Sequence, residues 1–500
     1  MDTVITIRQG TLRGSLVDGV RSFKGIPYAA PPVGANRFRP PRPAAPWSGV
    51  RDALHFGPKT RQPAYPPAIA LLLNELTGGG DDALSLNVWA PAFRSAAHPV
   101  MVWIPGGMFE FHGTGASPWY DGSRFARDGI VCVTINYRVG ADGFLCAGDE
   151  EANVGLLDQV AALTWVRDNI AAFGGDTGNV TVFGESAGAM SVASLLAMPR
   201  ANGLFQRAIL QSGAAHPVMS RTTATQICGN LASTLNVAAT RETLAAVPID
   251  RLLEAQMALH GELDADPDPK RWGKEVALSR MPWQPVVDGN VLPAPPLDRI
   301  AAGAADGVDV LVGTNADEHR LFLVTSGAIE HITEQALMGA IAAYDLPVSE
   351  TIAAYRVAHP GASPGDILAA IQTDWYWRMP AIRLAEAHSK RGATTYMYEF
   401  AWRSPQFDGR LGACHALDVP FVFDTLGEAT EPLWGRTPPQ HLANTMHAAW
   451  VGFAKDGCCR WPKYDAKRRA TMRFDAASGV VADPHAEART LWEGTLVPSR

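Results

Sequence analysis

The chain has 500 residues, of which 47% are hydrophobic and 19% charged, the balance of a globular protein with a large core. Its net charge of −7 provides no basic surface for nucleic acid, and no run of residues is apolar enough to span a membrane. We therefore expect neither a nucleic-acid partner nor a membrane partner.

The six cysteines are scattered along the chain without the spacing of a zinc site or of a CxxC motif. This usage is typical of a reduced compartment without a disulfide framework. The first residues have neither a basic start nor an apolar stretch like that of a signal peptide. We expect a cytoplasmic protein that uses no metal ion and no cofactor, while its oligomeric state is not determined by the sequence.

Three short β runs open the chain. They cover residues 4–7, 11–16 and 20–23, and they are separated by Gly10 and by Asp18-Gly19, which are turn signals. We expect hairpins here, and therefore a small antiparallel β region at the N-terminal end of the fold.

From about residue 84 onwards, short apolar runs alternate with helical patterns. The expected strands are residues 84–89, 100–104, 130–136, 180–183, 208–210, 308–312 and 396–400. Between the third and the fourth of these, apolar residues recur at helical spacing from Leu156 to Ile170. The alternation predicts an α/β fold with a large, mostly parallel central sheet and helices on both faces.

Helical patterns with variable loops fill residues 216–280 and 325–390. No internal repeat, low-complexity tract or clean linker divides the sequence. We therefore interpret residues 1–500 as a single domain that carries helical insertions in these two segments.

A nucleophile is predicted in the sequence Gly184-Glu185-Ser186-Ala187-Gly188. The residues before it are β-branched and apolar, as in a buried strand, and residues 189–196 have a helical pattern. A tight strand-to-helix turn crowds the backbone, so Gly184 and Gly188 must lack side chains. The turn exposes the hydroxyl of Ser186 and places the Ala187 amide at a helix N-terminus as an oxyanion donor.

A serine hydroxyl needs a base, an acid that orients this base, and an oxyanion site. In an arrangement where the acid and the histidine follow the serine, each of them comes after a strand. The loop after the expected strand at 308–312 contains Asp317 and Glu318, and His415 is a candidate base. Spacing alone leaves the choice between Asp317 and Glu318 open.

Further short sequence blocks precede the serine motif, in this order: FKGIPYA (23–29), PPVG (31–34), LSLNV (84–88), NYRVG (136–140), NVGLLDQ (153–159) and FGGD (173–176). With the serine motif, they resemble the type B carboxylesterase family of the α/β-hydrolase superfamily, a group that includes bacterial para-nitrobenzyl esterases. The resemblance runs through most of the chain. It implies the α/β-hydrolase fold and the hydrolysis of carboxylic esters through an acyl-enzyme.

The resemblance assigns a role to each member of a catalytic triad. Ser186 matches the nucleophile, Glu318 rather than Asp317 matches the acid, and His415 matches the base. The other functional positions that it implies are the oxyanion donors Gly107, Met108 and Ala187, the supporting residues Glu185 and Ser212, and the ion pairs Arg37–Asp81 and Arg138–Asp158.

The chain departs from the family at two places that border the expected site. Pro105 and Met108 stand in the oxyanion loop where a histidine and a small residue are usual, and we expect Met108 to narrow the acyl pocket. His319 and Arg320 follow the acid where glycine is usual. These two residues either favour a substrate that carries a carboxylate or face solvent, which is the commoner place for such side chains.

The candidate residues of the substrate pocket are Phe109, Trp119, His319, Arg320 and Trp375. We expect hydrolysis of small-molecule esters with short to medium acyl chains or aryl groups. The alternatives are a catalytically silent binding or adhesion-type relative, and a hydrolase of carbamates, amides or thioesters.

Overall fold

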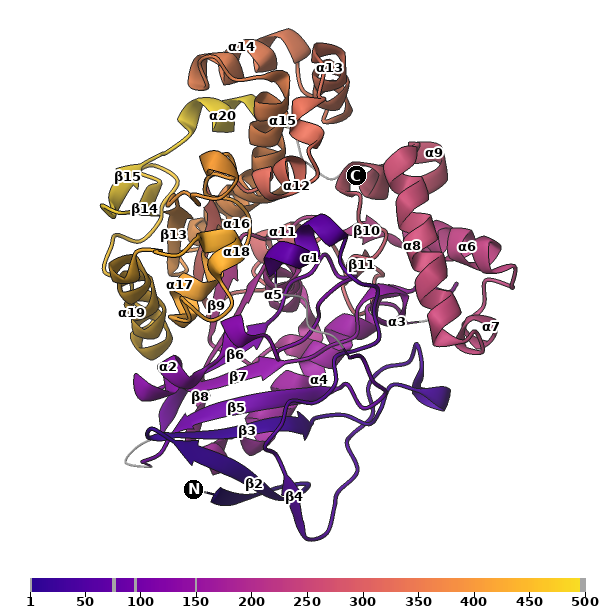
Figure 1. The fold of residues 1–500 in the computed structure, drawn as a ribbon, viewed down its shortest axis with the longest axis vertical. Helices are drawn as coiled ribbons and strands as arrows, with labels where there is room; N and C mark the ends of the chain where they lie inside the picture. Colours follow the sequence, from indigo (N-terminus) through magenta and orange to yellow (C-terminus); the bar gives the residue numbers. More distant parts are fainter. Residues whose placement is uncertain (1, 74–77, 94–96, 149–150, 495–500) are drawn as a thin grey trace.

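The computed structural model describes residues 2–73, 78–93, 97–148 and 151–494. Most of its strands form one large sheet in the order β1-β2-β3-β5-β7-β6-β8-β9-β12-β13-β14-β15, with β4 paired to β2 (Figure 1). The strands of this sheet are β1 (Asp2–Ile7), β2 (Gly10–Val17), β3 (Val20–Pro27), β4 (Val50–Asp52), β5 (Ser85–Pro91), β6 (His98–Ile104), β7 (Val131–Ile135), β8 (Gly175–Glu185), β9 (Arg207–Gln211), β12 (Asp309–Asn315), β13 (Thr395–Phe400), β14 (Ala470–Phe474) and β15 (Gly479–Ala482).

The strands from β7 to β14 in this order are parallel to one another. At one edge β1, β2, β3 and β5 are antiparallel, and at the other edge β15 is antiparallel to β14. The predicted parallel sheet with a small antiparallel N-terminal region is therefore confirmed. A separate parallel pair is formed by β10 (Met219–Ser220) and β11 (Val286–Val287).

The central strands are buried on both faces, which explains their continuous apolar sequences. In β6, Val100, Val102 and Ile104 belong to the core on one face, whereas Met101 and Trp103 belong to the core on the other. Because side chains alternate across a strand, such a segment needs apolar residues at every position.

Helices cover both faces of the sheet (Figure 1). The helices on one face pack on β6, β8, β9, β12 and β13 or on each other. They are α4 (Val154–Asn169), α5 (Ala187–Ala197), α11 (Pro296–Ala301) and α16 (Met379–Lys390). The other face is covered by α2 (Ser123–Arg127), α17 (Val419–Phe423) and α19 (Gln440–Asp456).

The two predicted helical segments form lobes beyond the sheet, seen at the right and at the top of Figure 1. The first lobe contains α6 (Arg221–Leu235), α7 (Arg241–Ala245), α8 (Ile249–Ala265), α9 (Pro269–Trp272) and α10 (Lys274–Ser279). The second contains α12 (Arg320–Thr325), α13 (Glu334–Ala343), α14 (Val348–Ala358), α15 (Pro364–Thr373) and the π-helical turn Asp374–Arg378. Four short helices complete the fold: α1 (Pro67–Leu73), α3 (Gly140–Phe144), α18 (Glu431–Trp434) and α20 (Ala486–Leu491).

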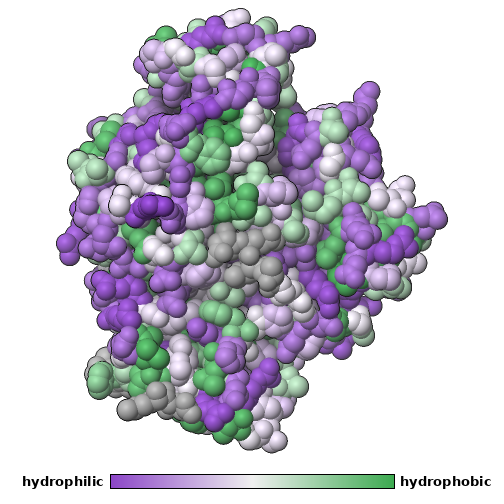
Figure 2. Space-filling view, viewed as in Figure 1, coloured by the Kyte–Doolittle hydropathy of each residue, from purple (hydrophilic) through white to green (hydrophobic). Residues whose placement is uncertain are grey.

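Polar residues cover much of the outer surface of both lobes (Figure 2). On the face drawn in Figure 2, apolar residues gather towards the middle, between the lobes. Within the described residues, none of the helices combines the length and the apolar character that crossing a membrane requires.

One of the two predicted ion pairs is present. Arg138 and Asp158 form a fully buried bidentate pair, with N–O distances of 2.8 and 2.7 Å. The prediction for Arg37 is wrong, because Arg37 pairs with Asp142 in α3 at 3.0 Å, and Asp81 pairs with Arg61. Asp142 is in reach because the loop after β7 folds back towards the N-terminal region, which sequence spacing does not reveal.

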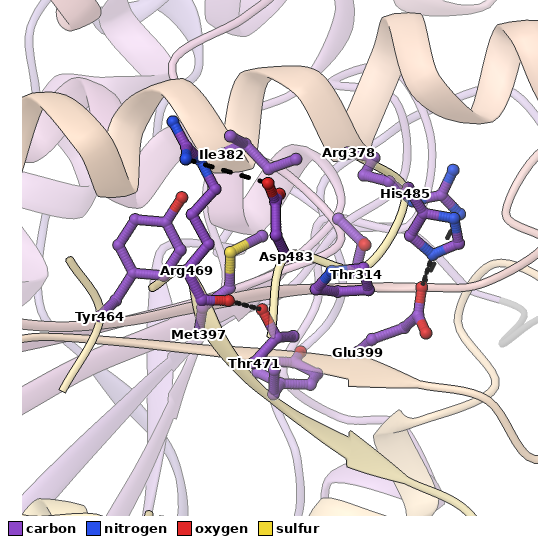
Figure 3. A pocket seen from close by; sticks show the side chains of 12 residues that line it. Thr314, Arg378, Ile382, Met397, Glu399, Tyr464, Arg469, Thr471, Asp483 and His485 are labelled. Carbon is purple, nitrogen blue, oxygen red and sulfur yellow. Dashed lines mark hydrogen bonds and ion pairs between the residues drawn. The ribbon is translucent and has the colours of Figure 1, made fainter. Parts of the chain in front are cut away.

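Strands β14 and β15 were not predicted from the sequence, because they are short and β15 is exposed throughout. A small pocket at this edge shows how the C-terminal segment is attached (Figure 3). There His485 lies 2.5 Å from the carboxylate of Glu399 in β13. Burial would raise the pKa of Glu399, but the hydrogen bond and charge of His485 and two arginines outweigh it and lower this pKa to about 2.

Candidate active site

Ser186 lies at the turn between β8 and α5, as predicted. Its backbone has φ 57° and ψ −126°, a conformation that a residue with a side chain rarely adopts. Two hydrogen bonds hold this turn: the Ser186 N–H donates to Gln211 at 2.9 Å, and the Met190 N–H donates to the Ser186 carbonyl at 2.9 Å. Strain of this kind is typical of a nucleophile elbow.

The flanking glycines are required by close approach of the neighbouring chain. A Cβ atom on Gly188 would lie 2.0 Å from the carbonyl oxygen of Ile104, and one on Gly184 would lie 2.6 Å from the carbonyl carbon of Gly188. Both distances are far below van der Waals contact. The elbow therefore excludes any side chain at these two positions, as the sequence analysis predicted.

His415 and Glu318 lie side by side although 97 residues separate them in sequence. The Nδ1 atom of His415 lies 2.7 Å from Oε2 of Glu318, and both side chains are buried. The other oxygen of Glu318 accepts a hydrogen bond from the Asn315 N–H at 2.8 Å, at the end of β12. In the neutral form of the imidazole, a proton on Nδ1 is donated to the carboxylate of Glu318, which leaves Nε2 as the basic nitrogen.

Asp317 does not contact His415. Its carboxylate accepts a hydrogen bond from the Ala413 N–H at 2.9 Å and lies 3.3 Å from a guanidinium nitrogen of Arg403. The choice between Asp317 and Glu318, which spacing left open, thus corresponds to two opposite directions of the side chains on one loop.

Glu185 is the second carboxylate close to the imidazole. Its Oε1 atom lies 3.2 Å from Nε2 of His415, near enough for an ion pair but without the angles of a hydrogen bond. Burial, followed by the charges of Asp418 and Glu318, raises the pKa of Glu185 to about 8, although His415 opposes this shift. Burial would lower the pKa of His415, but the charges of Glu185 and Glu318 outweigh it and raise this pKa to about 9.

Asp418 is a further buried carboxylate that the sequence analysis missed. It accepts hydrogen bonds from Gln211 at 2.9 Å and from the Tyr398 hydroxyl at 3.2 Å. Burial and the charge of Glu318 raise its pKa to about 6. An aspartate three residues after the candidate base, just before the apolar run at 419–423, was the available signal.

Ser212, which the resemblance implied as a supporting residue, lies directly after β9. Its hydroxyl is buried and has no hydrogen-bond partner among the described residues. Its main chain does connect two parts of the site, since the Ser212 N–H donates to Gly313 at 2.9 Å and so joins β9 to β12. The position of Ser212 therefore matters through its backbone.

The loop after β6 approaches Ser186 closely. A Cβ atom on Gly106 would lie 3.0 Å from Cβ of Ser186. Gly107 and Met108 both have positive φ angles, 113° and 56°. Among the described residues, nothing accepts a hydrogen bond from the N–H groups of Gly107 and Met108. The Ala187 N–H, at the first position of α5, is free of helical partners as well.

Ser186 and His415 line one cavity of about 740 Å³ between the two helical lobes. Its wall is mainly apolar and aromatic. Among the lining residues are Tyr65, Met108, Phe111, Trp119, Tyr120, Met190, Met257, Leu278, Phe322, Tyr344, Leu368, Tyr376 and Trp377. No group of three or more side chains suited to a metal ion occurs among the described residues.

Of the five expected pocket residues, Trp119 and His319 line the cavity. The His319 ring stacks on Tyr376 at 5.4 Å, and burial together with His415 lowers its pKa to about 3. His319 is therefore neutral at ordinary pH and provides no charge for a carboxylate. Its backbone N–H donates to Thr373 at 3.1 Å.

Phe109, Arg320 and Trp375 lie outside the cavity lining, which corrects their expected role. Phe109 is fully buried, because the loop turns its ring away to pack against Phe144 at 4.9 Å. Arg320 is held by Asp366, with an N–O distance of 2.5 Å. Successive helical residues point in different directions, so that Tyr376 and Trp377 face the cavity and Trp375 packs behind them.

Several polar residues of the cavity wall were not found by sequence reasoning. They are His112, His260, Asp264, Arg280 and Gln372. None of them belongs to a motif. Three of them lie in or next to α8 and α10, which are far from the triad residues in sequence. Only the folded lobes bring them to the site.

The fold and the strained serine turn, with a histidine in the same cavity that contacts a buried glutamate, define a hydrolase of the α/β-hydrolase class. The sequence profile of the Carboxylesterase family matches residues 1–492. The chain is 38% identical to the para-nitrobenzyl esterase of Bacillus subtilis (strain 168), with 97% of both chains covered. It is 33% identical to the phenmedipham hydrolase of Pseudarthrobacter oxydans, covering 96% of this chain and 98% of that one.

Among solved structures, a carboxylesterase of Geobacillus stearothermophilus superposes with a TM-score of 0.85 and 39% identity, covering 98% of this chain and all of that one. A para-nitrobenzyl esterase structure superposes with a TM-score of 0.84 and 36% identity over the whole of both chains. The chain therefore belongs to the carboxylesterase family and is a carboxylic-ester hydrolase. The family and the α/β-hydrolase fold predicted from the sequence are confirmed.

Proposed function

We propose that Ser186, His415 and Glu318 form the catalytic triad. The oxygen of Ser186 attacks the ester carbonyl carbon while Nε2 of His415 takes the hydroxyl proton, and Glu318 stabilises the resulting imidazolium. The tetrahedral intermediate then releases the alcohol, which receives this proton from His415, and an acyl-enzyme remains. Water repeats the two steps, so that the acid is released and Ser186 regains its proton.

The oxyanion of each tetrahedral intermediate is proposed to bind the N–H groups of Gly107, Met108 and Ala187. Three observations support this: the loop lies against Ser186, the first two N–H groups have no acceptor, and the third begins a helix. Backbone donors do not depend on the side chain, so Met108 serves as well as a small residue. Met108 lines the cavity, and we propose that its thioether narrows the acyl pocket.

The observation that carries the proposal is the 2.7 Å contact between Glu318 and His415, because His415 and Ser186 line the same cavity. We expect p-nitrophenyl butyrate to give a burst of p-nitrophenol of about one equivalent per chain in rapid mixing, provided that deacylation is the slower step. An organophosphate should label Ser186, as read by mass spectrometry of the digested protein. A label on any other residue would contradict the assignment.

Short to medium acyl esters and aryl esters are the proposed substrates, because apolar and aromatic side chains form most of the wall. Carbamates, amides and thioesters remain a second class of substrate, since the same catalytic groups attack their carbonyl carbon.

We further propose that residues 1–500 form one domain and that the protein is located in the cytoplasm. The location is supported by the six free cysteines, of which four are buried.

Glu185 is proposed to set the pH range of the reaction. The base must be neutral to accept the serine proton, so kcat/KM falls on the acidic side of its pKa. The negative charge of Glu185 stabilises the imidazolium and raises the pKa of His415. In Glu185→Gln we expect the acidic limb of the kcat/KM profile to move to lower pH by about one unit.

The control for this variant is Glu185→Asp, which keeps the negative charge. The acidic limb of its kcat/KM profile should lie closer to that of the wild type than the limb of Glu185→Gln does. The measurement is kcat/KM for p-nitrophenyl acetate across pH. The absorbance of the released p-nitrophenol is corrected for the ionisation of this phenol at each pH. An acidic limb that stays in place in Glu185→Gln would show that Glu185 does not act on His415.

A further inference from the structure

Arg280 is the only lysine or arginine among the described residues that line the catalytic cavity. It ends α10 in a left-handed conformation, with φ 56° and ψ 19°. Its Nη1 atom donates to the main-chain carbonyls of Leu263 and Asp264, each at 3.2 Å, at the C-terminal end of α8. These bonds hold the guanidinium in place on the wall.

The charge of Arg280 has no carboxylate partner within ion-pair distance among the described residues. Carbonyl oxygens satisfy some of its N–H groups, but they leave its net charge in place. An arginine on a cavity wall that is held and not neutralised is suited to a planar anion, which it binds through two parallel hydrogen bonds.

The nearby acidic side chains Glu110 and Asp264 contact His260 instead of Arg280. Glu110 is buried and lies 2.7 Å from Nδ1 of His260, while Asp264 lies 3.7 Å from Nε2 of the same ring and is 58% exposed. Burial would lower the pKa of His260, but the hydrogen bond and charge of Glu110 and the charge of Asp264 outweigh it and raise this pKa. Glu110 and Asp264 thus both face His260, whereas Glu185, the other acidic residue of the cavity lining, faces His415.

Arg280 lies at a distance from the proposed chemistry that a longer acyl chain can span. The ring of Trp377 is 5.1 Å from that of His415, and the ring of Tyr376 is 4.9 Å from that of Trp377. The Tyr376 hydroxyl in turn donates to the carbonyl of Ser279, next to Arg280, at 2.5 Å. The wall from His415 to Arg280 is therefore aromatic, with the cation at its far end.

We propose that the enzyme accepts esters whose acyl chain ends in a carboxylate, with the chain along the aromatic wall and the carboxylate on Arg280. The substrate class is thus the monoesters of medium-chain dicarboxylic acids. This proposal rests on the proposed function of Ser186. It assigns to Arg280, which the sequence analysis did not consider, the preference for a carboxylate that was one of two alternatives for His319 and Arg320.

The test compares three p-nitrophenyl esters with acyl chains of equal length. The first is the suberate monoester, the second its neutral carboxamide analogue, and the third carries a terminal trimethylammonium group. At low salt, we expect kcat/KM of the carboxylate ester to exceed that of the carboxamide by about tenfold, mainly through KM. Added salt should reduce this ratio, because it screens the charge.

Arg280→Gln should remove the preference and leave the carboxamide ester unaffected within about twofold, while Arg280→Lys should keep part of it. Equal rates for the carboxylate and carboxamide esters in the wild type, or a preference that survives in Arg280→Gln, would overturn the proposal. A preference for the ammonium ester would assign the site to Asp264 instead. If Arg280→Gln does not fold, competitive inhibition of the wild type by suberate but not by suberamide carries the test.

Loss of the proposed function gives a different result from loss of this site. If Ser186 is not the nucleophile, its alanine variant will still turn over p-nitrophenyl acetate, which cannot reach Arg280. If only the anion site is wrong, Ser186→Ala is inactive, and the wild type has equal kcat/KM for the suberate monoester and for its carboxamide analogue.

Discussion

Replacing Ser186 with alanine is expected to lower kcat for p-nitrophenyl butyrate by about five to six orders of magnitude. The cavity, the base and the oxyanion donors remain, but no acyl-enzyme can form. The strained turn should persist, since the Ser186 N–H bond to Gln211 involves only the backbone. Steady-state rates and the loss of organophosphate labelling would both be measured.

Ser194→Ala is the matched control for this change. Ser194 is buried in the same helix α5. Within the part of the chain that the structure describes, its hydroxyl donates only to the Met190 carbonyl one turn earlier, at 2.9 Å. We expect rates within about twofold of the wild type, because the bond removed is local and modest. Residual labelling in Ser186→Ala at the wild-type rate would mean that another residue is the nucleophile.

Replacing Glu318 with glutamine is expected to reduce kcat by a factor of about 10⁴. The Asn315 N–H donates to Oε1 of Glu318, so this position will keep the amide oxygen of the glutamine. The amide NH₂ group then faces Nδ1 of His415 and forces the proton onto Nε2. In this tautomer His415 cannot accept the proton of Ser186.

Asp317→Asn is the control, since it removes the neighbouring charge on the same loop. The amide oxygen of asparagine can still accept the hydrogen bond from Ala413, and we expect kcat within a few-fold of the wild type. Thermal unfolding of both variants would be followed to show that they are folded. A larger loss in Asp317→Asn than in Glu318→Gln would reverse the assignment of the acid.

The elements that could be predicted from the sequence are those in which neighbouring residues carry the information. The apolar run of β6 reflects burial on both faces, and the glycines beside Ser186 mark a tight turn by their spacing in sequence, although Ile104 in β6 is also among the residues that exclude a side chain there. Strands β14 and β15 were missed because both are short, and because the edge strand β15 is exposed at every residue and so has little hydrophobic signal.

The ion pairs show the limit of local information. Arg138, just after β7, and Asp158, in α4, are paired as the resemblance implied. Arg37 instead takes Asp142 as its partner, because the partner of a side chain is chosen by the path of the surrounding loops. The same reason explains why Arg320, expected in the pocket, is bound to Asp366 outside it.

The sequence by itself determined the class of fold, the family, and the residue types needed for ester hydrolysis, with Ser186 on a turn that its own neighbours specify. Only the tertiary structure decided which side chains meet. The order of strands brings Glu318 and His415 together from β12 and from the loop after β13, and the folding of the two lobes brings Arg280 to the cavity. Local patterns encode burial and backbone shape, whereas contacts between distant segments depend on the packing of the whole chain.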